Sequence, residues 1–232
     1  MKRLGLIVLV TASMGLGFAP SVRADVLFDS ISGQTAFSGD SIGPITPTNN
    51  QGPIYSSFTT GSQSLLLSSV ELGLSATAPN DGGLVNVSIW SDLNSILPGL
   101  GPGPNAPVGF VGSISDSTIV SSDPTNPTLI TLIPSNPILL DPSSMYWVEL
   151  DSGQTTSSSA FWSWQLGSSG IGASVNYSEN AGTAYVVNSN LAQGLTYFVK
   201  VSGMPVPEPS ALAILGVGVL GIGLLWQARR HS

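Results

Sequence analysis

The stretch Val85-Asn86-Val87-Ser88-Ile89-Trp90 alternates three apolar β-branched residues with Asn, Ser and Trp. Side chains of a β-strand point alternately to its two faces, so this period of two indicates a strand with one buried face. The same alternation recurs over residues 146–150 and 197–201. These three segments predict a fold built from antiparallel strands.

Other short apolar runs lie between turn-forming residues, such as Asp123-Pro124 and Asp141-Pro142-Ser143. Because Pro, Gly, Asn and Asp favour turns, these boundaries predict about ten short strands and no soluble helix. We expect the 98–107 stretch, with its Pro and Gly residues, to be a loop. The sequence therefore predicts one all-β domain, an antiparallel sandwich or jelly roll over residues 25–203. The further strands are expected at 26–30, 54–60, 65–76, 109–114, 129–133, 160–166 and 183–187.

Few residues of the 232 are charged, 8% against a usual figure of about 25%. The chain has no Cys, which excludes a disulfide, a lipidated cysteine, a thiolate nucleophile and a Cys-based metal site. Between Asp25 and Val206, Lys200 is the only Lys or Arg, against twelve Asp and Glu. Such a surface repels phosphate groups, so we expect no binding of nucleic acid.

The N-terminus resembles a secretory signal peptide. Lys2 and Arg3 precede an apolar run, and Val22-Arg23-Ala24 supplies the small residues that a signal peptidase requires. We therefore expect residues 1–24 to be removed by cleavage between Ala24 and Asp25. The alternative is an uncleaved N-terminal anchor.

The C-terminal tail, residues 204–232, has three consecutive parts. Pro207-Glu208-Pro209 comes first, an uncharged apolar segment follows over residues 211–226, and Arg229-Arg230 lies near the end. Sixteen residues of helix measure about 24 Å, slightly less than a hydrocarbon core of about 30 Å. We expect a transmembrane helix there, with Arg229 and Arg230 stopping the chain on the cytoplasmic side.

In this order, the three parts closely resemble the PEP-CTERM sorting signal of Gram-negative bacteria. The resemblance implies that an exosortase, an integral membrane enzyme, recognises Pro207, Glu208 and Pro209 and removes the tail. It implies a transient stay in the inner membrane, followed by delivery to the outer surface or extracellular matrix. The alternative is a permanent C-terminal anchor.

The order of segments in the body also resembles a known family. Val87-Ser-Ile89-Trp90-Ser-Asp92 is followed by a Pro-Gly loop, and Pro137-Ile-Leu-Leu-Asp-Pro142 leads into Tyr146-Trp147-Val-Glu-Leu150. Over about residues 25–170 this looks like the choice-of-anchor β-sandwich domains, most nearly type R. That family implies an exported β-sandwich and supplies no catalytic residues.

Candidate chemistry is sparse. The only histidine is His231, outside the β domain, which excludes His-dependent catalysis and His-ligated metal sites there. Glu149 and Asp151 share one face of a strand and could act as paired carboxylates in a glycoside hydrolase. We favour an exposed strand end instead. A structural calcium ion near Asn80-Asp81 or Asp123 is a further alternative, although turn chemistry explains these residues. We expect no cofactor.

Trp162 and Trp164 lie two residues apart on one strand face, where two indoles could stack on sugar rings. The alternative, which we favour, is burial in the core. Three functions therefore remain: a non-enzymatic structural or adhesive surface protein, a carbohydrate-binding module for surface polysaccharide, and, least favoured, a carboxylate-dependent glycoside hydrolase.

Overall fold

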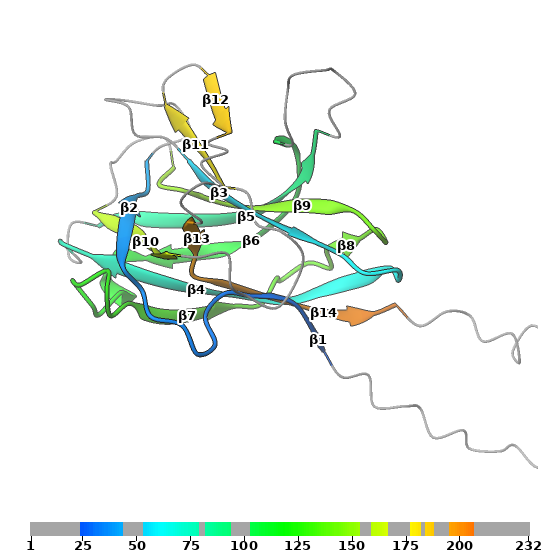
Figure 1. Ribbon diagram of the computed structural model, residues 1–232, viewed down its shortest axis with the longest axis horizontal. Helices are drawn as coiled ribbons and strands as arrows, with labels where there is room; N and C mark the ends of the chain where they lie inside the picture. The colour runs from blue at the N-terminus through cyan, green and yellow to red at the C-terminus, as the bar shows by residue number, and fades with distance from the viewer. Residues whose placement is uncertain are drawn as a thin grey trace, which may run out of the picture.

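The computed structural model describes residues 24–43, 53–78, 82–93, 103–153, 159–166, 177–181, 184–187 and 195–206. Strands make up most of this part of the chain, which confirms the all-β prediction (Figure 1). A single 3-10 turn, η1 (Asp116–Thr118), accompanies them. The strands are β1 (Asp25–Asp29), β2 (Ser38–Ser41), β3 (Ile54–Thr59), β4 (Leu65–Ala76), β5 (Leu84–Asp92), β6 (Pro104–Ser115), β7 (Thr128–Leu132), β8 (Leu139–Leu140), β9 (Met145–Asp151), β10 (Ala160–Leu166), β11 (Tyr177–Ala181), β12 (Ala184–Val187), β13 (Leu195–Tyr197) and β14 (Val199–Pro205).

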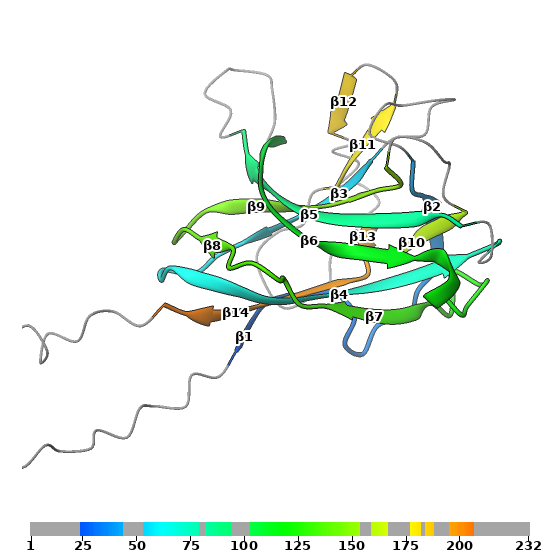
Figure 2. The same cartoon turned by 180° about the vertical axis from the view of Figure 1, so that it is seen from behind.

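Two antiparallel sheets lie one above the other (Figures 1 and 2). The eight-stranded sheet has the order β1-β14-β4-β10-β13, with β2 paired to β10 and both β7 and β8 paired to β4. The six-stranded sheet has the order β12-β11-β3-β9-β5-β6. The first and last strands of the described domain, β1 and β14, are therefore neighbours, although they are far apart in the sequence.

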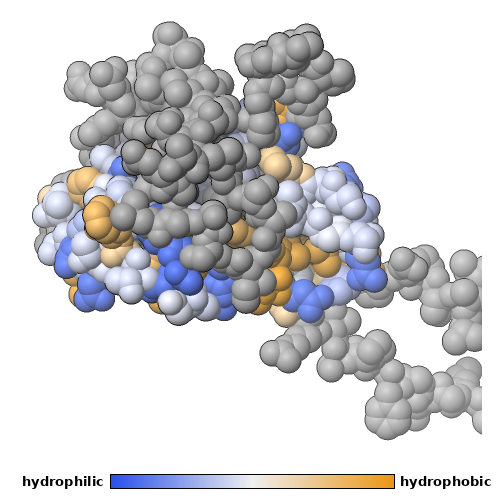
Figure 3. All heavy atoms as spheres, in the orientation of Figure 1, coloured by the Kyte–Doolittle hydropathy of each residue, from blue (hydrophilic) through white to orange (hydrophobic). Residues whose placement is uncertain are grey.

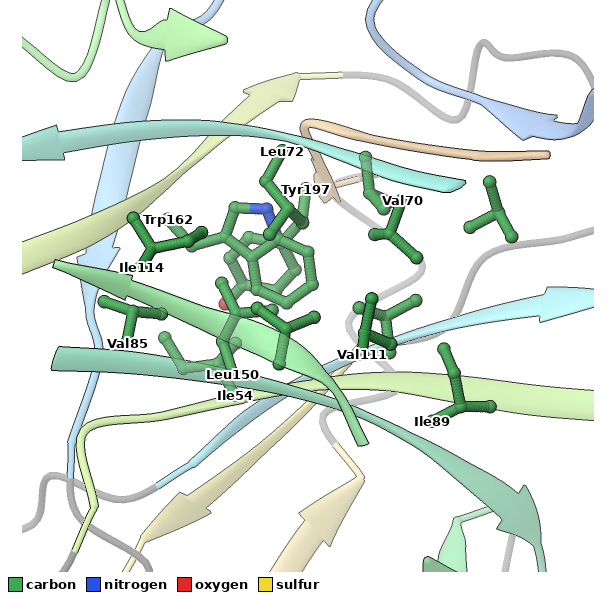
Figure 4. Packing of buried hydrophobic residues seen from close by; sticks show 14 of the residues in the cluster. Ile54, Val70, Leu72, Val85, Ile89, Val111, Ile114, Leu150, Trp162 and Tyr197 are labelled. Atoms are coloured by element: carbon green, nitrogen blue, oxygen red, sulfur yellow. The ribbon is translucent and has the colours of Figure 1, made fainter. Parts of the chain in front are cut away.

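The core fills the space between the sheets with the residues that the alternation predicts. Val85, Val87 and Ile89 of β5 are fully buried, and Tyr146, Val148 and Leu150 of β9 join the same cluster. Figure 4 shows side chains of both sheets meeting there, with Trp162 beside Tyr197. Thirty hydrophobic residues are buried among those described, so a normal apolar core accounts for folding without disulfides.

The structure differs from the sequence prediction at several strands. β6 begins at Pro104, inside the stretch expected to be a loop, and pairs with β5 through three register shifts. β2, β8 and β11 were not predicted. No helix among the described residues is long and apolar enough to cross a membrane. The expected signal peptide and the expected span at 211–226 lie outside the described residues, apart from Ala24.

Candidate functional site

The last strand continues almost to the sorting tripeptide. β14 pairs with β4 as far as Pro205, which lies opposite Leu65. Val206 then donates its backbone N–H to the carbonyl oxygen of Ser64 at 3.1 Å. Pro207 is the next residue, so the domain reaches the tripeptide without a linker. Met204 and Pro205, which the sequence placed in the tail, belong to the sheet.

The first strand begins equally close to the expected N-terminal cleavage site. β1 starts at Asp25, which lies opposite Gly203 in the antiparallel pairing with β14. The beginning of β1 and the end of β14 therefore lie together at one end of the eight-stranded sheet (Figures 1 and 2). We call this end the tail pole: residues 25–27, the turn and strand start at 61–65, and residues 204–206.

Gly203 allows the three strands of the tail pole to approach closely. A Cβ atom at this position would lie 3.2 Å from Leu27 Cδ1 and 3.3 Å from Leu65 Cβ. Both distances are tighter than ordinary van der Waals contact. The register shifts on both sides of this point, between Ser202 and Gly203 and between Val26 and Phe28. The end of β14 thus lies closely packed between the start of β1 and the start of β4.

The surface of the tail pole carries an open hollow. Its lining consists of Asp25, Leu27, Gly61, Ser62, Gln63 and Leu65. Ser62 and Gln63 are exposed, whereas Leu65 is buried beneath them. In Figure 3, the end where β3 turns into β4 is mostly pale to blue, in keeping with this polar turn. The tail pole thus offers neutral polar groups, the one carboxylate of Asp25 and the exposed apolar side chains of Val26 and Met204.

The two tryptophans of β10 do not form an exposed pair. Both point toward the core, but Trp162 is 0% exposed and its ring stacks on Tyr197 at 4.5 Å. Its indole Nε1 donates to the carbonyl oxygen of Phe198 at 3.0 Å. The favoured prediction, burial in the core, is confirmed for Trp162. The alternative of a two-tryptophan sugar platform is wrong, because Trp162 has no free face.

Trp164 is half-buried and takes part in a different cluster. Its ring lies 5.5 Å from that of Phe37, which is 58% exposed. Its Nε1 donates to Asp40 Oδ1 at 3.2 Å, and the hydroxyl of Tyr197 donates to Asp40 Oδ2 at 2.5 Å. We call Phe37, Trp164 and Asp40 the aromatic edge. The sequence did not single out Phe37 or Asp40, since β2 has no apolar alternation.

Glu149 and Asp151 do share a face of β9, as predicted, but that strand end is not exposed. Each is 3% exposed. The Tyr55 hydroxyl donates to Glu149 Oε1 at 2.8 Å, and the Trp90 indole donates to Oε2. Burial raises the pKa of Glu149 to about 7, and these two hydrogen bonds oppose that rise.

Asp151 is held in a similar way by neutral donors. Its Oδ1 accepts from Asn86 Nδ2 at 3.1 Å and from the Gly153 N–H at 2.5 Å. Both carboxylates therefore already have partners within the protein. We call Tyr55, Asn86, Trp90, Glu149 and Asp151 the acid network.

One buried acid has a cation instead. Asp29 lies 3.3 Å from Lys200 Nζ and accepts hydrogen bonds from Ser32 and from the Ile31 N–H. Burial raises the pKa of Asp29, but the bonds from Ser32, Ile31 and Lys200 outweigh burial and hold that pKa below its ordinary value.

The calcium alternative falls on two different loops. Asp123 Oδ1 accepts from both the N–H and the hydroxyl of Thr125 at 2.8 Å, the geometry of a self-capped turn. Asn80 and Asp81 lie outside the described residues. Within the part of the chain that the structure describes, no three His, Cys, Asp or Glu residues cluster as metal ligands.

Comparison with known families supports the interpretation of the tail. Residues 205–230 match the PEP-CTERM protein-sorting motif, which covers Pro207, Glu208, Pro209, Arg229 and Arg230. No curated protein matches the chain. The motif overlaps the β domain only at its last residues, Pro205 and Val206, so the choice-of-anchor resemblance stays a prediction. The C-terminal tail thus carries the sorting motif of an exported protein that an exosortase processes.

Proposed function

We propose that the mature protein is a non-enzymatic structural or adhesive component of the cell surface or of its polysaccharide matrix. The observation that supports this proposal is that the candidate binding and catalytic side chains are buried or hydrogen-bonded within the fold. Trp162 is core, and the carboxylates of Glu149 and Asp151 accept hydrogen bonds inside the protein. These two acids are the carboxylate pair that the sequence suggested for a hydrolase, and both are buried, so we rank that alternative last.

The proposal also includes the steps by which the protein is exported and processed. Signal peptidase removes residues 1–24, and the 211–226 segment holds the precursor in the inner membrane as a helix. Arg229 and Arg230 remain on the cytoplasmic side. An exosortase then recognises Pro207-Glu208-Pro209 and releases a type R-like choice-of-anchor β-sandwich toward the outside of a Gram-negative cell.

Fractionation of cells that express an internally tagged chain tests the proposal. The parent protein should appear in the surface or matrix fraction, whereas a Pro207→Ala/Pro209→Ala variant should stay with the inner membrane. A Pro124→Ala/Pro127→Ala variant is the matched control, since these two prolines precede β7 at the other end of β4, where Thr128 pairs with Leu74. Recovery of the parent solely in the periplasm would contradict the surface role.

A second candidate function, binding of surface polysaccharide, is supported by the aromatic edge. An exposed ring beside a half-buried indole, with a carboxylate close by, offers stacking and hydrogen bonding to a sugar. Phe37→Ser should reduce retention on purified surface polysaccharide, while Val120→Ser, at an 87% exposed position, should not. Equal retention of both variants and the parent would defeat this candidate. Replacing Trp162 would not discriminate, because it opens the core.

A further inference from the structure

We propose that the tail pole of the folded domain contacts the membrane enzyme that processes the sorting motif. This inference rests on the sorting role of the tail, and it adds a surface of the β domain to the recognition peptide. It is based on the absence of a linker between the β domain and the recognition peptide. Val206 is still hydrogen-bonded to Ser64, and Pro207 follows immediately.

The length of the chain limits how far the enzyme can keep from the domain. Consecutive Cα atoms lie about 3.8 Å apart, so Glu208 is at most roughly 8 Å from Val206 in any conformation. An α-helix with its side chains is about 10–12 Å thick. Groups that bind Glu208 from an enclosing active site therefore also meet the surface around Val206, which is the tail pole.

The short chain between Val206 and the apolar segment also limits the distance between the domain and the bilayer. From Val206 to the start of the apolar segment at Ala211 the chain spans at most about 18 Å, at roughly 3.6 Å per residue. The polar layer of one leaflet takes up about 5–8 Å of this. The remaining gap of about 10 Å is too small for a protein layer between domain and bilayer. The enzyme must approach from the side, past the tail pole.

The chemistry of the tail pole favours a protein partner over the lipid surface. The turn presents Ser62 and Gln63, and the adjoining hollow includes Asp25 and Leu27. Within the described residues of this pole there is no Lys or Arg, whereas binding to anionic lipid head groups depends on such cations. The pole also exposes the apolar side chains of Val26 and Met204, so it joins an apolar patch to a polar rim, as transient protein interfaces do.

The test follows processing of the full-length precursor in a strain that has the processing enzyme. Ser62→Glu/Gln63→Glu places two charges on the tail pole, and Ser122→Glu/Asn126→Glu places two at exposed positions beyond the opposite end of β4. Each variant is made with and without a six-residue Gly-Ser insertion between Val206 and Pro207. Pulse labelling measures conversion to the mature form, and limited proteolysis of the precursor verifies folding.

We expect the pole variant to be processed roughly threefold to tenfold more slowly than the parent, the effect of weakening a single interface contact. The distal variant should be processed at the parent's rate, and the insertion should restore the pole variant. Equal rates for the pole and distal variants, or a defect that persists with the insertion, would overturn the contact. A parent chain that is never processed would overturn the sorting role itself and this contact with it.

Discussion

Asp29 and Glu149 are almost equally buried, at 5% and 3% exposed. Their surroundings in the two sheets nevertheless shift their pKa values in opposite directions. On the eight-stranded sheet, Asp29 is paired with Lys200, and its pKa is lowered. On the six-stranded sheet, Glu149 has only the neutral donors of Tyr55 and Trp90, and burial raises its pKa to about 7. A domain with one basic residue and twelve acids has no second cation to offer.

The two acids therefore act on stability at opposite ends of the pH range. The folded pKa of Glu149 exceeds the ordinary value of 4.5, so its contribution is complete below about pH 4.5 and is lost as pH rises through about 7. The folded pKa of Asp29 lies below the ordinary 3.8, so its contribution is present above about that pH and is lost on further acidification. Stability should be greatest at mildly acidic pH.

The largest expected effect is the loss of unfolding free energy as the buried carboxyl group of Glu149 ionises. The parent protein should lose about 3 kcal/mol of unfolding free energy between pH 5 and pH 8, because one pKa unit corresponds to about 1.4 kcal/mol. Glu149→Gln, which keeps the shape without the charge, should flatten this slope. Urea denaturation at several pH values measures it, and an unchanged slope would show that Glu149 is not its source.

Removing the cation from the eight-stranded sheet should have the next largest effect. Lys200→Met leaves Asp29 with its Ser32 and Ile31 bonds but without the ion pair, and should cost about 1–2 kcal/mol at neutral pH. The pKa of Asp29, followed by NMR, should rise toward its ordinary value. A variant with the parent's stability and the parent's Asp29 pKa would contradict the role of the pair.

A smaller loss is expected when one neutral donor is removed. Tyr55→Phe deletes the hydroxyl that donates to Glu149 and should cost about 1 kcal/mol. The cost should grow above pH 7, where the carboxylate is charged and needs the donor most. Denaturation at pH 5 and pH 8 makes the comparison, and an equal cost at both values would mean that the hydroxyl does not stabilise the charged form.

The smallest effect is expected for Glu71→Gln, which is the matched control for Lys200→Met. Glu71 lies opposite Lys200 on β4 in the sheet register, but the described ion pair of Lys200 is with Asp29. Glu71→Gln should change the unfolding free energy by less than about 0.5 kcal/mol. A loss as large as that of Lys200→Met would show that both acids share the cation.

The sequence predicts the parts of this fold in which one strand face is buried. The alternation at residues 85–90 matches the burial of β5, and strands β4 and β10 have the predicted bounds. β9 differs from the prediction because it is buried on both faces, and the strand expected at 197–201 is divided between β13 and β14. β2 (SGDS) and β11 (YSENA) were missed because they lie in the sheets through backbone pairing and lack apolar alternation. Local pattern carries no information about such pairing.

The burial of Glu149 and Asp151 could not be predicted from the sequence for a related reason. Glu149 and Asp151 were correctly placed on one face, but the donors that allow burial come from distant strands. Tyr55 is 94 residues from Glu149 along the chain, and Asn86 is 65 from Asp151. The sorting tripeptide could be recognised from its neighbours alone, whereas its distance from the sheet depended on the β14–β4 register.

Mass spectrometry of both termini of the processed protein tests the central claim most directly. We predict that the mature chain begins at Asp25, the first residue of β1, and has lost the apolar segment and the Arg229-Arg230 end after a cut near Pro207-Glu208-Pro209. A mature protein that begins at Met1, or that still yields a peptide containing Trp226, would contradict the account.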